Sequence, residues 1–320
     1  MKITVIFTGG TIGSSRDGDV ISPRAENSRL LLDMYRRSGG DAELTVKEPY
    51  RILSENLTAD RLLSLGDCVK NSLDGCDGVI VTHGTDTLPY ASAYLGYVFG
   101  GSSVPIVLAS ANYPLADSRS NGLQNFRAAA DFIRCAGGTG VFVSYKNTGD
   151  GFTTIHRATR LLPQLPYTDS VFSATGACYG RTEGKGFCKN TGYSAVKDEV
   201  SLGGEIFGDV LFLRAHPCMT LPQLTPQIRA VLLEGYHSGT LPTDVSGFCD
   251  FCDEARKKGV PVYLTGACEG FDYESKQSFS RLGIVPLPAA SPAAMYVKLL
   301  LCKNPADVLK PCAEDFVLMP

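Results

Sequence analysis

A threonine follows two glycines near the amino terminus, in the stretch "KITVIFTGGTIGSS". Residues 2–8 have the pattern of a strand, and Gly9 and Gly10 then allow the backbone to adopt positive φ angles. A threonine hydroxyl is a weak nucleophile that becomes reactive when a neighbouring group takes its proton. Thr11 is therefore a candidate nucleophile on a tight turn. The turn does not match a phosphate-binding loop, because it contains neither G-x-G-x-x-G nor G-K-[ST].

A second group of polar residues ends a later apolar run, in "DGVIVTHGTDTLPY". Five polar side chains surround Gly84 there: Thr82, His83, Thr85, Asp86 and Thr87. A threonine beside a carboxylate is a plausible pair for activating a nucleophile or positioning water. A simpler alternative is that Asp86 and Thr87 cap the next helix. For His83, a structural hydrogen-bonding role is the more common one.

The elements that must position these residues alternate between strand and helix. Apolar runs predict strands at 2–8, 43–47, 77–84, 104–110 and 140–145, and helical periodicity predicts helices at 25–37, 58–71, 88–100 and 121–136. This order predicts an α/β fold with a mostly parallel sheet that is covered on both faces. Because the carboxyl ends of parallel strands meet at one edge, the two polar motifs are expected to lie together.

The second half of the chain repeats this pattern on a smaller scale. We expect strands at 209–215 and 261–267 and helices at 225–236, 245–259 and 291–302. A polar, glycine-rich middle segment separates the halves. The predicted organisation is an N-terminal α/β catalytic domain at 1–180, a linker at 181–204 and a C-terminal α/β domain at 205–320.

The composition is that of a globular protein without a special partner. Of 320 residues, 44% are hydrophobic and 20% are charged, and the net charge is −3. We therefore expect no nucleic-acid or membrane partner, and no export signal is visible. The eleven cysteines are scattered; Cys249 and Cys252 have C-x-x-C spacing but lack two further zinc ligands nearby. His156, His216 and His237 show no metal spacing, and we expect no cofactor.

Taken together, the motifs resemble one known family. A chain that opens on "TGGTI" and continues to "HGTDT" resembles the bacterial-type, cytoplasmic (type I-like) L-asparaginases. The segments "ILSENLT", "LASANYPLADSRSNGLQN" and "LEGYHSGTLP" extend the resemblance over essentially the whole chain. It implies a two-domain α/β fold and hydrolysis of L-asparagine to L-aspartate and ammonia.

The resemblance also implies roles for individual residues. Thr11 is expected to be the nucleophile, and Thr85 and Asp86 the second catalytic cluster. Asp86 is also expected to bind the substrate ammonium group, and Ser54 its α-carboxylate. The segment from Gly13 to about Ile21 is expected to close over the site as a lid. The substrate pocket is further expected to include Gly10, Glu55, Gly84 and Ala109.

Two positions depart from the family pattern. Arg160 stands where the family has a catalytic lysine, and arginine stays protonated, so it can orient groups but cannot act as a base. Lys146 is nearby in the sequence but falls too early in the alignment. The lid lacks the family tyrosine, since Val20 or Ile21 occupies its place, and Ser14 or Ser15 is the available hydroxyl. These departures predict a slow enzyme.

Alternatives to an asparaginase stay open. Glu55 adds a negative charge beside Ser54, which favours a different amide substrate. An amidase subunit that supplies ammonia to a partner is another possibility, although such relatives carry an added N-terminal domain and this chain begins at its first strand. A third is an amino-acid-binding or regulatory homologue that has lost turnover. A cytoplasmic homodimer or homotetramer with a small amino-acid substrate is the expected state.

Overall fold

The protein divides into two compact units, which are described separately below. In this computed structural model the described residues are 1–17, 20–267 and 273–318. The first unit is Met1–Tyr193 and the second is Ser194–Pro320. The segment predicted as a linker, 181–204, therefore begins within the first unit, because most of β9 and all of β10 lie in it and pair with the first sheet.

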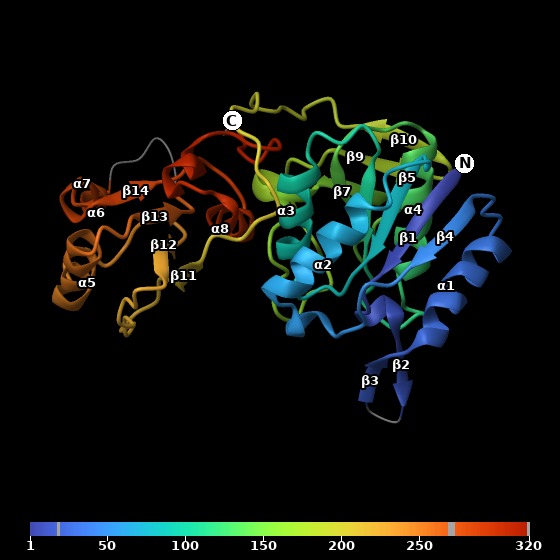
Figure 1. The fold of residues 1–320 in the computed structure, drawn as a ribbon, viewed down its shortest axis with the longest axis horizontal. Helices are drawn as coiled ribbons and strands as arrows, with labels where there is room; N and C mark the ends of the chain where they lie inside the picture. The colour runs from blue at the N-terminus through green and yellow to red at the C-terminus, as the bar shows by residue number, and fades with distance from the viewer. Residues whose placement is uncertain (18–19, 268–272, 319–320) are drawn as a thin grey trace. The chain divides into compact units, whose positions relative to one another are not determined.

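The first unit is built on an eight-stranded sheet with the order β10-β9-β8-β7-β6-β5-β1-β4 (Figure 1). The strands from β4 to β7 pair in parallel, as predicted, and β8, β9 and β10 pair antiparallel. The strands are β1 (Lys2–Phe7), β4 (Glu43–Lys47), β5 (Gly78–Thr82), β6 (Ile106–Ala109), β7 (Val141–Tyr145), β8 (Thr153–Arg157), β9 (Gly180–Glu183) and β10 (Gly186–Lys189).

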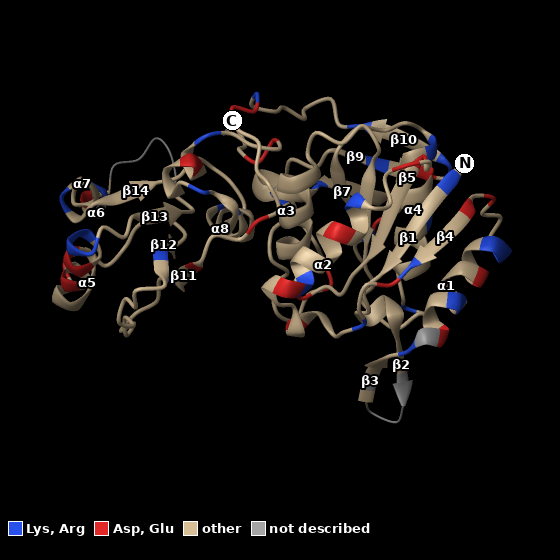
Figure 2. Ribbon diagram, in the orientation of Figure 1, with Lys and Arg blue, Asp and Glu red and all other residues tan. Residues whose placement is uncertain are grey.

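Helices cover the sheet of the first unit. They are α1 (Ala25–Arg37), α2 (Ala59–Lys70), α3 (Leu88–Phe99) and α4 (Gly122–Arg134), with the short 3-10 turns η1 (Thr11–Gly13), η2 (Ser54–Asn56), η3 (Ala158–Arg160) and η4 (Ala174–Gly176). Leu31 of α1 and Phe126 of α4 share one core with Val5 of β1. Strand β5 and helix α3 carry no charged residue, whereas α1 and α2 carry both signs (Figure 2). This pattern is expected when a central strand and its covering helix are buried.

The second unit contains a four-stranded parallel sheet with the order β11-β12-β13-β14. Its elements are β11 (Asp209–Arg214), β12 (Ile228–Glu234), α5 (Ser246–Lys257), β13 (Val262–Thr265), α6 (Glu274–Gln277), α7 (Phe279–Leu282), β14 (Ile284–Pro286), α8 (Pro292–Leu301) and η5 (Pro305–Leu309). The helix predicted at 225–236 is wrong, because most of that segment is β12. The strand lies between β11 and β13 with Val231, Leu232 and Leu233 all buried, so both of its faces are apolar.

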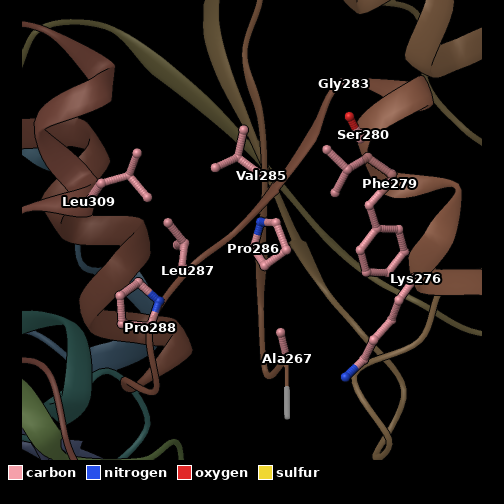
Figure 3. A pocket seen from close by; sticks show the side chains of 11 residues that line it. Ala267, Lys276, Phe279, Ser280, Gly283, Val285, Pro286, Leu287, Pro288 and Leu309 are labelled. Atoms are coloured by element: carbon pink, nitrogen blue, oxygen red, sulfur yellow. The ribbon is translucent and has the colours of Figure 1, made fainter. Parts of the chain in front are cut away.

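A cavity of about 730 Å³ lies along β14 in the second unit. Figure 3 shows Val285 and Pro286 on the strand and Leu287 directly after it, with Lys276 and Phe279 on one side. Most of its lining is apolar. None of the helices among the described residues is long and apolar enough to cross a membrane.

Candidate active site

The first strand ends in a turn that neighbouring segments of the same chain hold by hydrogen bonds. The Thr8 hydroxyl donates to the Thr82 carbonyl at 2.7 Å. Gly9 and Gly10 follow with φ angles of 101° and 69°, which glycine adopts readily. The Gly10 N–H donates to the Ile52 carbonyl at 2.8 Å, so it is already engaged. Thr11 then begins η1 with its side chain partly buried.

Two glycine turns from different strands touch each other directly. A Cβ atom on Gly10 would lie 2.3 Å from the Gly84 nitrogen and 2.4 Å from its Cα. A Cβ atom on Gly84 would lie 2.5 Å from the Ser54 Oγ. Such approaches are possible only for glycine. The structure therefore brings the turn of Thr11, the "HGTDT" motif and Ser54 into contact, because β1 pairs with β5.

Ser54 and Asp86 lie next to each other at this edge of the sheet. The buried Ser54 hydroxyl donates to Asp86 Oδ2 at 3.4 Å, which is a long hydrogen bond. The Thr87 hydroxyl donates to the Ser54 carbonyl at 2.8 Å. Thr87 occupies the N-cap position of α3, but its side chain forms no cap hydrogen bond. Its side chain therefore ties the two motifs together instead of capping the helix. Asp86 is exposed and Thr85 is partly buried.

The remaining predicted pocket residues flank this contact. Glu55 is exposed, one residue after Ser54. Ala109 ends β6, and its carbonyl accepts the His83 N–H at 3.0 Å. His83 itself is buried, with Nδ1 2.9 Å from the Gly84 carbonyl. Burial lowers the pKa of His83, and the backbone hydrogen bond opposes this shift only in part. These contacts agree with a structural role for the ring.

The segment expected to form a lid begins as a hairpin. Strands β2 (Ser14–Asp17) and β3 (Val20–Pro23) pair antiparallel. The Ser14 hydroxyl is buried and donates to the Gly10 carbonyl at 2.7 Å, so it braces the turn. Ser15 is partly buried, and Val20 is 63% exposed. Residues 18–19 of the expected lid, and the side chain of Ile21, lie outside the described part.

Arg160 lies in a segment that packs on α3. The Ser92 hydroxyl donates to the Ala158 carbonyl at 3.1 Å, and a Cβ atom on Gly96 would lie 2.8 Å from Thr159. Arg160 is fully buried, and its guanidinium carbon lies 4.6 Å from the centre of the Tyr193 ring. A cation over an aromatic face is attracted to the ring. Arg160 is thus a fixed, buried positive charge, and its catalytic role stays a prediction.

A clamp at the carboxyl ends of β6 and β7 was missed by the sequence analysis. The fully buried Asn125 amide donates to the Ser110 carbonyl at 2.8 Å and accepts the Lys146 N–H at 2.7 Å. The Asn121 amide donates to the Lys146 carbonyl at 2.8 Å. The available signal was an asparagine on the apolar face of a helix.

Among the described residues no group of three His, Cys, Asp or Glu is arranged to hold a metal ion.

A model of the N-terminal asparaginase domain matches residues 2–172. The chain therefore belongs to the asparaginase family of amidohydrolases, as the sequence predicted.

Relatives match over most of the chain. An L-asparaginase of Thermococcus kodakarensis is 25% identical over 94% of this chain and 92% of its own length. One subunit of a glutamyl-tRNA(Gln) amidotransferase from Haloquadratum walsbyi is 28% identical over 93% of this chain and 70% of its own.

Solved structures confirm the predicted fold class. The thermostable L-asparaginase from T. kodakarensis superposes with a TM-score of 0.80 at 22% identity, with both chains covered completely. A probable cytoplasmic L-asparaginase from Campylobacter jejuni gives a TM-score of 0.78 at 19% identity, covering 96% of this chain and 98% of the other.

Proposed function

We propose that this chain hydrolyses the side-chain amide of L-asparagine to L-aspartate and ammonia, with Thr11 as the nucleophile. The observation that supports the proposal is the contact of Gly10 with Gly84 and of Gly84 with Ser54, because Thr11 directly follows Gly10 and the Thr85–Asp86 pair directly follows Gly84. The likeness over the whole chain to an L-asparaginase of T. kodakarensis supports it.

The proposed chemistry has two steps. The Thr11 hydroxyl attacks the carboxamide carbon, and its proton goes to the departing ammonia, which leaves an acyl ester on the threonine. Water then attacks the ester, releases aspartate and returns the proton to the threonine. Backbone N–H groups are needed for the developing oxyanion. Because the Gly10 N–H is bound to Ile52, we assign this task to the N–H groups of Thr11 and Thr85.

Asp86 and Ser54 are proposed to hold the amino-acid part of the substrate. The exposed Asp86 carboxylate suits an ammonium group, and the Ser54 hydroxyl suits the α-carboxylate. Their present hydrogen bond is long, 3.4 Å, so exchanging it for substrate contacts costs little. Gly10, Glu55, Gly84, Thr85 and Ala109 complete the proposed pocket. The buried Arg160 is proposed to orient the second cluster by its charge.

A different amide is the second candidate substrate. The exposed carboxylate of Glu55, next to Ser54, favours it. Several matched relatives are subunits of glutamyl-tRNA(Gln) amidotransferases, which favours an amidase of that kind. An amino-acid-binding homologue without turnover is the third candidate, because Arg160 cannot take a proton. We further propose that the protein is cytoplasmic, in line with the probable cytoplasmic L-asparaginase of C. jejuni, and that it forms a homodimer or homotetramer.

The experiment is an assay of ammonia release over a panel of amides, combined with calorimetry of aspartate binding. The proposal expects release from L-asparagine above all other amides. Release from another amide with none from asparagine would favour the second candidate. Aspartate binding without release from any amide would favour the third.

A further inference from the structure

A polar cavity of about 230 Å³ lies against α4 in the first unit. Gln124, Arg127, Ala128 and Asp131 line it from one side of the helix, at the spacing i, i+3, i+4 and i+7 that marks a single helix face. α4 packs on the sheet through its apolar face, which includes Phe126, Ala130 and Ile133. The face that lines the cavity is polar apart from the small Ala128. Two threonines line the sheet side of the cavity, the register partners Thr153 and Thr182.

Charged side chains of both signs line this cavity. Arg127 and Lys146 are cationic, and Asp131 and Glu183 are anionic. Within residues 1–17, 20–267 and 273–318, Arg127, Lys146 and Glu183 form no ion pair. Asp131 forms a long ion pair with Arg134, whose Nε lies 3.8 Å away, beyond the distance of a hydrogen bond. The cavity therefore offers a ligand charged donors and acceptors of both signs.

Asp131 is the buried charged side chain in the wall of this cavity. Its residue is only 7% exposed, and burial raises the pKa of its carboxyl, although Arg134 and Arg127 act in the opposite sense. A buried carboxylate without a hydrogen-bond donor is costly. A ligand that brings a positively charged donor to Asp131 removes that cost.

We propose that this cavity binds a small zwitterionic α-amino acid, with its ammonium group on Asp131 and its carboxylate on Arg127 and Lys146. The volume is below the roughly 300–1,000 Å³ of sites for drug-sized ligands, which suits a small metabolite. A simple anion leaves Asp131 unsatisfied, and a simple cation leaves the two cationic side chains unsatisfied. An amino acid satisfies both sets at once.

The wall of the cavity is held in place before any ligand arrives. The Lys146 backbone is fixed on both sides, by Asn125 at 2.7 Å and Asn121 at 2.8 Å. A preformed site spends less free energy on ordering its groups. The site goes beyond the proposed function, because neither Thr11, Ser54 nor Asp86 lines it.

Calorimetry on the Asp86→Asn protein tests the proposal, because that change removes the ammonium-binding carboxylate of the proposed catalytic site. The probes are L-alanine, propionate and ethylamine. L-alanine is expected to bind with one site per chain, at least about 10-fold more tightly than either half-molecule. Adding Asp131→Asn or Arg127→Met is expected to weaken alanine binding by about 10-fold or more.

The matched controls are Asp33→Asn and Arg36→Met, which alter an exposed ion pair on α1. They are expected to leave alanine binding unchanged. If a cavity variant fails to fold, Lys146→Met on the partly exposed lysine serves in its place. The proposal is overturned if alanine does not bind, if it binds no better than propionate or ethylamine, or if the cavity variants do not weaken it. Ammonia release is not part of the readout, so a failure here is distinct from a failure of the proposed function.

Discussion

His156 makes the stability of the first unit depend on pH. The ring lies on β8, is only 2% exposed and places Nδ1 2.8 Å from the Ser173 hydroxyl. Its Nε2 atom has no hydrogen-bond partner among the described residues. Burial lowers the pKa of His156 from 6.5 to about 4. The folded protein therefore keeps the ring neutral at pH values where the unfolded chain protonates it.

The size of the effect follows from proton linkage. Below pH 6.5 the His156 ring binds more protons in the unfolded chain than in the folded protein. Its neutral form therefore leaves the free energy of unfolding unchanged above pH 6.5, and this free energy decreases as the pH falls. Each unit by which the pH falls in this window lowers the free energy of unfolding by about 1.4 kcal/mol. From pH 6.5 to about 4, His156 alone is expected to lower the free energy of unfolding by about 3 kcal/mol.

The assay compares the free energy of unfolding of wild type and of His156→Gln, measured by urea denaturation between pH 7 and pH 4. Hydrogen exchange of the backbone amides of β7 and β8 reports the unfolding of the first unit. His83, which is also buried with a lowered pKa, contributes equally to both proteins and cancels in the difference. The wild type is expected to lose about 3 kcal/mol more than the variant. The exposed control His216→Gln is expected to follow the wild type. Parallel curves for wild type and His156→Gln would refute the reasoning.

Three further changes test the candidate site. Gly84→Ala places a Cβ atom 2.5 Å from the Ser54 hydroxyl, so we expect the free energy of unfolding, measured by thermal denaturation, to fall by about 1–3 kcal/mol. Gly101→Ala, with open space around it, is the control, and equal losses would argue against the glycine contact. Asp86→Asn is expected to weaken aspartate binding by ~1.5–3 kcal/mol in calorimetry, and unchanged affinity would exclude its role. Arg160→Lys combined with Val20→Tyr is expected to raise kcat more than it changes KM in ammonia-release kinetics. A wild type that already turns over asparagine at ~10² s⁻¹, above the ~10 s⁻¹ enzyme median, would contradict the argument from missing residues.

The strands β1, β5, β6 and β7 were predictable because each reads as a short apolar run between helices. The error at 225–236 has the same origin. "IRAVLLE" is apolar on both faces, and periodicity cannot distinguish such a strand from a buried helix. Strands β9 and β10 were missed for the opposite reason. They are polar, and β10 is the edge strand with β9 beside it, so the sequence contains no apolar run to mark them. The buried strand β8, "TTIHR", was missed because it is mostly polar.

The site was predictable in its residue types but not in its contacts. The motifs predicted that Thr11 and Asp86 share one edge of the sheet, because each follows a strand. The family resemblance implied that Ser54 belongs to the same pocket. The direct contact of Gly10 with Gly84 depends on β1 and β5 being neighbours, and strand order is not written in the sequence. The charges around Asp131 were equally hidden, since they come from α4, the β7–β8 connection and β9.

The central claim is that Thr11 carries out the nucleophilic attack, and ammonia release by Thr11→Ala tests it most directly. The protein is compared with wild type and with Thr11→Ser, which keeps a hydroxyl. Circular dichroism verifies the fold, and calorimetry verifies that aspartate still binds. We expect Thr11→Ala to lose ~10³-fold or more of the release from L-asparagine, while Thr11→Ser retains measurable turnover. A folded Thr11→Ala protein that binds aspartate and releases ammonia at the wild-type rate would contradict the account.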